Sequence, residues 1–388
     1  MSKFSTEIAE FIEQNSKLNI AEIALLLSKK PDWPKEFILN QINGRQKAVK
    51  KFPFLLQFQD FEFPNPTAVA QASSEVTARF KASLINGSSI ADLSGGMGID
   101  SYFFAQKFKQ VVYVEKQVEL FNLVEENLKL LAGDKIHCVN NSAENFLQKQ
   151  LQFDWIYIDP DRRAEKSKTF QIETSSPNIV ELLPLLFEKT NQLMIKLSPL
   201  LDLKDGIRKL PFTKFIYVIA VEGECKELLF LLEKGFEGEP QIEAMNLNKN
   251  DKSSFIFKFS DEIAAQISYS APQKYLYEPN AAILKSGGFK SLAVKLKLEK
   301  LSENTHLYTS ENRVTEFPGR VVEIEKIGKP EKKFMTFANV VSRNFPMSPA
   351  DIRKKYSIRE GQKEFLYACT LTGKKKVFIG GMLLSQDL

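Results

Sequence analysis

The chain has 388 residues, of which 43% are hydrophobic and 26% are charged. This length predicts two or three domains, and the composition excludes a collagen-like, low-complexity or wholly disordered chain. The three cysteines and two histidines are scattered, so we expect neither a disulfide framework nor a bound metal. The sequence shows no apolar run long enough to cross a membrane and no signal-peptide pattern, so we expect a cytoplasmic protein without a membrane partner.

The positive charge lies mostly in the last part of the chain. Residues 320–388 contain 14 Lys and Arg against 7 Asp and Glu, a net charge of +7, although the whole chain carries only +5. A basic domain favours a polyanionic partner, because clustered cations release the counterions of phosphates. A solvated lysine-rich face is the alternative, and charge alone leaves both open.

Residues 1–70 are predicted to form an N-terminal helical region. Apolar residues recur at helical spacing after a Ser/Thr cap, and again over 20–27 and 37–49. Pro31 and Pro34 break the chain between these helices. Three further prolines predict an extended linker: Pro53, Pro64 and Pro66.

Between residues 71 and 234 short apolar runs alternate with helical patterns, starting with a helix at about 73–84. This alternation predicts βαβ units and a parallel, doubly wound α/β sheet. Residues 225–232 follow a turn at Gly223 and are predicted to return antiparallel to the strand before them. The predicted parallel strands cover 90–93, 111–114, 136–139, 155–158, 193–197 and 215–221.

The rest of the chain predicts a small α+β, ferredoxin-like connecting domain at 235–319 and a small basic α+β domain at 320–388. In the first we expect a strand at 255–259, a linker at 272–279 and short helices within 281–298. In the second we expect strands at 321–327, 365–370 and 376–383 and a helix at 349–356.

A glycine-rich turn, Asp92–Gly98, joins the first predicted strand to a helix. Glycine lets the backbone approach a ligand closely, and a helix N-terminus offers unpaired N–H groups. A dinucleotide fingerprint that began at Gly96 and Gly98 would need a third glycine where Ser101 stands. The turn therefore argues against a nicotinamide oxidoreductase.

The strand-end acid followed by this turn resembles motif I of class I S-adenosylmethionine (SAM) methyltransferases. The resemblance implies a Rossmann-like methyltransferase sheet with SAM as the cofactor. Glu115 ends the second predicted strand, where a carboxylate can accept both ribose hydroxyls. Asn141 to Ala143 follow the third strand and would line the adenine pocket, although Ser142 as a plain helix cap is an alternative. The candidate cofactor-binding residues of these segments are Asp92, Ser94, Gly95, Gly96, Met97, Gly98, Glu115, Asn141, Ser142 and Ala143.

The fourth predicted strand ends in Asp159-Pro160 at the carboxyl edge of the sheet, where open α/β folds bind ligands. This pair resembles the first half of the Asp/Asn-Pro-Pro-aromatic motif of methyltransferases that act on exocyclic amino groups. A carboxylate and a backbone carbonyl can hold the amino hydrogens, so that placement supplies most of the rate. Asp159 and Pro160 are therefore the candidate catalytic residues.

The residues after Pro160 depart from that motif. Asp161 replaces the second proline, and Arg162 and Arg163 replace the aromatic residue. The two arginines can hold phosphate, although a salt bridge to Asp161 is an alternative. We assign Asp161, Arg162, Arg163 and Lys196, which closes the fifth strand, to substrate binding.

The chain as a whole resembles a bacterial family of SAM-dependent methyltransferases with a C-terminal THUMP-like domain, related to the RNA cap guanine-N2 (trimethylguanosine synthase-like) methyltransferases. The resemblance implies that Thr77 lies over the methionine end of SAM. It also implies an RNA partner, for which Arg343, Lys354 and Lys355 provide a basic surface. The resemblance rests on Gln71–Ala78, Asp92–Gly98, Asp159–Arg163, Glu278–Asn280, Phe317–Arg320 and Ala338–Pro346.

Together these features predict a SAM-dependent methyltransferase that transfers a methyl group to an exocyclic amino nitrogen of an RNA base. The sequence leaves two alternatives open. One is a methyltransferase of a protein or small molecule. The other is a non-catalytic RNA-binding module with a relic SAM fold.

Overall fold

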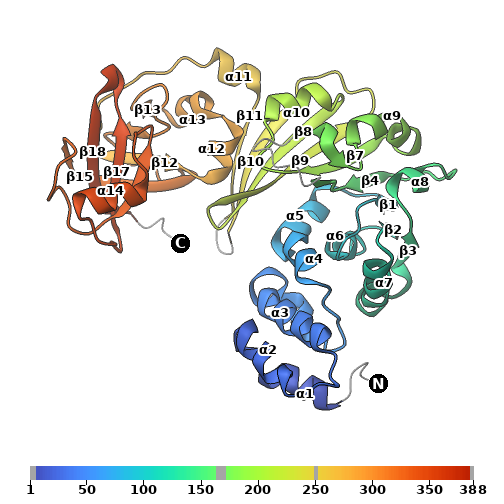
Figure 1. The fold of residues 1–388 in the computed structure, drawn as a ribbon. Helices are drawn as coiled ribbons and strands as arrows, with labels where there is room; N and C mark the ends of the chain where they lie inside the picture. The colour runs from blue at the N-terminus through green and yellow to red at the C-terminus, as the bar shows by residue number, and fades with distance from the viewer. Residues whose placement is uncertain (1–5, 163–171, 249–251, 385–388) are drawn as a thin grey trace. The chain divides into compact units, whose positions relative to one another are not determined.

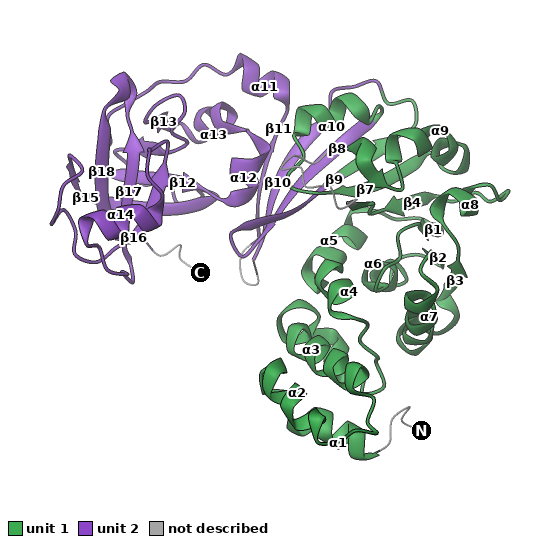
Figure 2. Cartoon of the chain, in the orientation of Figure 1, with its two compact units in different colours: residues 1–212, 230–236 green, residues 213–229, 237–388 purple. Residues whose placement is uncertain are grey.

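The computed structural model describes residues 6–162, 172–248 and 252–384 (Figure 1). The chain forms two compact units (Figure 2). Unit 1 comprises Met1–Phe212 and Phe230–Phe236, and unit 2 comprises Thr213–Leu229 and Glu237–Leu388. None of the helices in the described ranges is long and apolar enough to cross a membrane.

The first part of unit 1 is helical, as predicted: α1 (Thr6–Gln14), α2 (Ile20–Ser28) and α3 (Lys35–Lys51). Their apolar faces share one small core, built from Ile12, Ile23, Leu27, Ile38 and Ile42. The extended linker predicted from the next prolines is confirmed only in part, because residues 58–65, which include Pro64, form neither helix nor strand. Pro53 and Pro66 each begin a short helix, η1 (Pro53–Gln57) and α4 (Pro66–Gln71), because the first helical turn needs no N–H from proline.

The sheet of unit 1 has the strand order β7-β4-β1-β2-β3, and all four of these pairings are parallel. This confirms the predicted doubly wound α/β class. The strands are β1 (Ser89–Asp92), β2 (Gln110–Glu115), β3 (Ile136–Asn140), β4 (Trp155–Ile158) and β7 (Gln192–Leu197). The helices that accompany them are α5 (Glu75–Leu84), α6 (Ile99–Phe104), α7 (Val118–Ala132), α8 (Ala143–Leu147), α9 (Ile179–Lys189) and α10 (Leu203–Lys209) (Figure 1).

Strand β9 (Glu224–Glu233) has residues in both units and lies between β7 and β8 (Thr213–Val221) in the strand order. Glu222 and Gly223 both have positive φ angles, 52° and 79°. Positive φ at both central residues is the geometry of a two-residue hairpin turn, so the predicted antiparallel return of this strand is confirmed.

Two more strands of unit 2 extend the sheet beyond β8. Strand β10 (Gln241–Leu247) pairs parallel with β8, and β11 (Lys252–Phe257) pairs antiparallel with β10. Both segments were predicted to belong to the separate connecting domain at 235–319, and strand β10 was not predicted. The residue limits assigned to the four domains stay predictions.

The rest of unit 2 contains a seven-stranded sheet of order β13-β14-β12-β15-β18-β17-β16. The predicted linker at 272–279 is wrong, since its second half is strand β12. Leu276 and Tyr277 are buried there, and Pro279 stands at the last position of the strand, where the ladder needs no N–H. The strands are β12 (Tyr275–Pro279), β13 (Glu299–Lys300), β14 (Tyr308–Ser310), β15 (Gly319–Gly328), β16 (Asn339–Arg343), β17 (Glu364–Thr370) and β18 (Lys376–Leu383). The helices are α11 (Phe259–Ala264), α12 (Ala281–Ser286), α13 (Phe289–Leu296) and α14 (Pro349–Tyr356).

Gly44, in the middle of α3, is the point of closest packing in the N-terminal helices, because a Cβ there would overlap the Phe63 ring. In an exposed helix, Gly→Ala stabilises by about 1 kcal/mol. Here we expect Gly44→Ala to lower the free energy of unfolding by about 1–3 kcal/mol, measured by urea denaturation. Adding Phe63→Leu should recover part of the loss, and an undiminished stability of Gly44→Ala alone would contradict this packing.

Candidate active site

The glycine-rich loop lies between β1 and α6 and is held against the end of β2. The backbone N–H of Gly95 donates to the Val114 carbonyl (2.9 Å), and the Tyr113 hydroxyl donates to the Gly96 carbonyl (2.7 Å). A Cβ at Gly95 would overlap the Tyr113 ring, and Gly98 has a φ of 75°. Glycine is therefore required at both positions, one for space and the other for its backbone conformation.

Glu115, the last residue of β2, connects this loop to the next segment. One carboxylate oxygen accepts the Gly96 N–H at 3.0 Å, and the other accepts the Gln117 N–H at 2.8 Å. The Glu115 carbonyl accepts the N–H of Asn141, at the end of β3. One residue thus sets the relative positions of the loop and two strand ends.

A cavity of about 290 Å³ opens at this edge of the sheet. Its wall is formed by the glycine-rich loop, the strand ends of β2, β3 and β4, and helix α4 with the residues that follow it. The structure brings these predicted site residues together in it: Ser94, Gly95, Gly96, Met97, Gly98, Glu115, Asn141, Ala143, Asp159 and Asp161.

Thr77, Asp92, Ser142, Pro160 and Lys196 do not line this cavity. Thr77 is buried, and both its N–H and its hydroxyl bond Ser74, the N-cap of α5. Ser142 accepts the N–H of Asn145 and so caps α8. For Ser142 the structure therefore favours helix capping, the alternative that the sequence left open.

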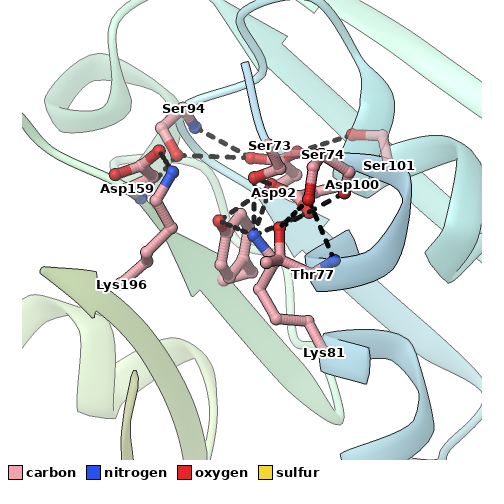
Figure 3. A network of polar contacts seen from close by, with 11 residues as sticks. Ser73, Ser74, Thr77, Lys81, Asp92, Ser94, Asp100, Ser101, Asp159 and Lys196 are labelled. Atoms are coloured by element: carbon pink, nitrogen blue, oxygen red, sulfur yellow. Dashed lines mark hydrogen bonds and ion pairs between the residues drawn. The ribbon is translucent and has the colours of Figure 1, made fainter. Parts of the chain in front are cut away.

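Asp159 follows β4 and stands at the cavity wall with its side chain one-third exposed (33%). Its backbone N–H donates to the Ser94 hydroxyl at 2.6 Å. Lys196, on β7, forms an ion pair with Oδ2 of Asp159 (Figure 3). Lys196 was assigned to substrate binding from the sequence, and its observed contact is instead with the candidate catalytic carboxylate.

The residues after Pro160 form a short ribbon, β5 (Asp161–Arg162), which pairs with β6 (Ser175–Ser176). Asp161 lines the cavity, and burial is the main reason that its pKa is raised above its ordinary value, while Lys116 acts in the opposite direction. Arg163 lies outside the described residues.

A polar network that was not predicted from the sequence lies at the cavity, and two of its residues, Ser73 and Asp100, line the cavity wall (Figure 3). Lys81, on α5, is fully buried and lies 2.8 Å from Oδ1 of Asp100 and 2.6 Å from the Ser73 hydroxyl. Ser73 and Tyr157 both donate to Oδ2 of Asp100, at 2.6 and 3.0 Å. Burial alone would raise the pKa of Asp100, but the charges of Lys81 and Lys196 and the hydrogen bonds from Lys81 and Ser73 bring it below its ordinary value. The available signal was a lysine at helical spacing from the buried residues Thr77 and Ala78.

Asp92 lies beneath the loop and is almost completely buried (1% exposed). The Ser101 hydroxyl donates to Oδ2 at 2.6 Å, and the Ser94 N–H donates to Oδ1 at 3.1 Å. Desolvation outweighs these bonds and raises the pKa of Asp92 to about 7. The Asp92 carboxyl group therefore holds the loop through these hydrogen bonds and does not line the cavity.

The predicted basic residues of unit 2 have different surroundings. Arg343 donates from Nε and Nη2 to the buried carboxylate of Glu278, at 3.0 and 2.6 Å. Lys354 and Lys355 are exposed on α14, and the ammonium group of Lys355 lies over the Tyr356 ring. Among the described residues, no group of three His, Cys, Asp or Glu side chains could hold a metal ion.

Two sequence families match parts of unit 2. One is described as a ferredoxin-like domain and matches residues 275–318, and the other is described as THUMP domain-like and matches residues 329–382. The chain carries a THUMP-like domain. This confirms the expected C-terminal family, whereas the relationship to the RNA cap guanine-N2 methyltransferases stays a prediction.

A crystal structure of a candidate methyltransferase from Porphyromonas gingivalis W83 is similar to the whole chain. It is 29% identical, the match covers 99% of this chain and 100% of that one, and the TM-score is 0.86. An rRNA methylase from Streptococcus thermophilus (16% identity, 41% and 93% covered) and TrmK from M. capricolum, crystallised with S-adenosylhomocysteine (16%, 45% and 70%), have TM-scores of only 0.31 and 0.33. No curated protein sequence matches the chain.

The buried Lys81–Asp100 pair yields a stability prediction. We expect Lys81→Met to lower the free energy of unfolding by about 3–5 kcal/mol, because it leaves the Asp100 charge buried without its main partner. Lys129 is an exposed lysine whose ion pairs lie on the surface of α7, so Lys129→Met should change the stability much less than Lys81→Met. Urea denaturation measures both, and equal losses would contradict the role given to Lys81.

Asp92 yields a pH prediction. The folded chain holds its proton up to about pH 7, whereas the unfolded chain releases it near the ordinary pKa of 3.8. Its contribution to stability is therefore present at low pH and lost as the pH rises through about 7. Asp92→Asn can keep both hydrogen bonds, because the Ser101 hydroxyl can accept from the amide. We expect the stability of this variant relative to the native chain to increase between pH 5 and pH 8, and a constant difference would contradict the raised pKa.

Proposed function

We propose that this chain is a SAM-dependent methyltransferase that methylates an exocyclic amino nitrogen of an RNA base. The observation that carries the proposal is a single cavity that joins the glycine-rich loop, Glu115 and Asp159. The similarity over the whole chain to the candidate methyltransferase from P. gingivalis supports it.

The cavity suits the nucleoside part of SAM. Each oxygen of Glu115 accepts one backbone N–H and has lone-pair capacity left for a ribose hydroxyl. Gly95 and Gly96 leave the loop backbone open to a ligand, and Asn141 and Ala143 line the wall where adenine would pack. SAM would supply a methyl group bound to a positively charged sulfur. A nitrogen lone pair can attack this methyl carbon directly, and the sulfur leaves as a neutral thioether.

The role proposed for Asp159 follows from its partners. The Lys196 ammonium and the Ser94 hydroxyl fix the orientation of this residue. Lys196 pairs with Oδ2, and the second carboxylate oxygen, Oδ1, also has lone pairs that can accept hydrogen bonds. Oδ1 would accept a hydrogen of the amino group and thereby turn the nitrogen lone pair towards the methyl group. After transfer, the nitrogen carries an extra proton, which it releases to this carboxylate or to water.

RNA as the substrate is supported by the THUMP-like domain and by the charge of residues 320–388. Lys354 and Lys355 are exposed there and can contact phosphates.

Two variants separate the proposed roles. We expect Asp159→Ala to lower methyl transfer at least about a hundredfold while changing the Kd of SAM less than about threefold, because the residue acts on the acceptor. We expect Glu115→Ala to raise the Kd of SAM at least about tenfold, because it removes hydrogen bonds to a charged group. Isothermal titration and single-turnover transfer measure both, and loss of SAM binding in Asp159→Ala would contradict its role.

The acceptor is identified with SAM labelled with tritium in its methyl group. The protein is incubated with extract of cells that lack it, and the RNA, protein and small-molecule fractions are counted separately. Label in RNA supports the proposal, and digestion to nucleosides then identifies the atom. Label in another fraction contradicts RNA as the substrate, and SAM binding without any transfer favours the non-catalytic alternative.

A further inference from the structure

A second cavity, of about 240 Å³, lies within unit 2. It is lined by the end of β10, the β12–α12 corner, the start of β15 and the end of β16. Three of these four segments belong to stretches that carried the sequence resemblance but received no role in methyl transfer. The lining residues used below are Asn246, Glu278, Asn280, Arg320 and Arg343.

The cavity carries an excess positive charge. Glu278 is buried (4% exposed) and accepts hydrogen bonds from Arg343, from Arg320 (3.0 Å) and from the Tyr367 hydroxyl (3.0 Å). Two guanidinium groups therefore share one carboxylate. The Arg320 side chain is half exposed (51%). Its guanidinium group has five N–H donors, so it can bind an anion while it remains paired with Glu278.

Two buried polar atoms at this cavity have no partner among the residues that the structure describes. These are Oδ1 of Asn246, in a residue only 5% exposed, and Nδ2 of Asn280. Oδ1 of Asn280 is already used to cap α12. An unsatisfied buried amide costs about 1–3 kcal/mol, and such groups are rare unless a ligand or water completes them.

A purely structural role accounts for Glu278, since a buried carboxylate needs cationic partners. It does not account for the second guanidinium, or for one acceptor and one donor left unused at the same cavity. A ligand that has an anionic group, a hydrogen-bond donor and a hydrogen-bond acceptor would pair with the second guanidinium, with Oδ1 of Asn246 and with Nδ2 of Asn280.

We propose that this cavity binds one phosphate-bearing ribonucleotide unit. Its phosphate contacts Arg320 and Arg343, and polar groups of its base or sugar bond Asn246 and Asn280. The identification of the ligand with RNA rests on the proposed function, whereas the phosphate chemistry rests on the two arginines.

The test measures binding of a short fluorescein-labelled single-stranded RNA to the full chain without SAM, at one fixed salt concentration. We expect Arg320→Ala to weaken binding about tenfold, because it removes charge-assisted hydrogen bonds. Arg359→Ala is the matched control. It removes an exposed arginine of the same unit that does not line this cavity, and its effect should stay below about twofold.

A second variant separates binding from folding. Asn246→Leu replaces an unsatisfied buried amide with an apolar group of similar size, so the midpoint of thermal unfolding should stay equal or rise. RNA binding should nevertheless weaken about fivefold. Unchanged binding in this variant and in Arg320→Ala would overturn the proposal, as would equal losses in Arg320→Ala and Arg359→Ala, or no RNA binding by the native chain.

Competition with a nucleoside 5′-monophosphate distinguishes the two sources of phosphate. Displacement of the RNA assigns the site to a terminal phosphate, and an Arg320-dependent complex that resists displacement assigns it to the strand backbone. Both results support the site. SAM binding is measured on the same samples, so failure of this proposal and failure of the proposed function are distinguishable.

Discussion

The candidate active site depends on the contact between the glycine-rich loop and the end of β2. The loop can lie against this strand only because Gly95 leaves room for the Tyr113 ring, while the Tyr113 hydroxyl and the Glu115 carboxylate bond the loop backbone. The same Glu115 also holds Asn141 through its carbonyl. The loop conformation therefore depends on the Glu115 side chain, to which we also assign the ribose of SAM in the proposed function.

Charges around the site are arranged in pairs of unequal exposure. Lys81 and Asp100 are buried beside the cavity, where Ser73 and Tyr157 complete the hydrogen bonds that a buried ion pair requires. Lys196 and Asp159 form a more accessible pair at the cavity wall, and this exposure fits the role proposed for Asp159. The two pairs therefore differ in exposure, because the Lys81 side chain is fully buried whereas the Asp159 side chain is one-third exposed (33%).

Unit 2 also contains a buried carboxylate with cationic partners, that of Glu278. The THUMP-like match and the positive charge of residues 320–388 concern the surface of this unit, whereas the Glu278 network and the two unsatisfied asparagines concern a cavity within it. A basic surface attracts nucleic acid of any sequence, while a cavity with directed donors and acceptors can hold one unit in a fixed position. In the proposed enzyme the first would concentrate RNA and the second would position it.

The sequence by itself determined the order of strands and helices in unit 1, the glycine-rich loop and the acids at the strand ends, because periodicity and local backbone demands act between near neighbours. Predictions from the sequence were wrong or absent where a residue's partner lies far from it in the sequence. Pro53, Pro66 and Pro279 suggested linkers, yet the first two begin helices and the third ends a paired strand. Only the tertiary structure decided that Lys196 faces Asp159, that Lys81 meets Asp100 and that Arg320 and Arg343 share Glu278. These partners lie 19 to 65 residues apart in sequence, and they attract one another only when folding brings the two charges together.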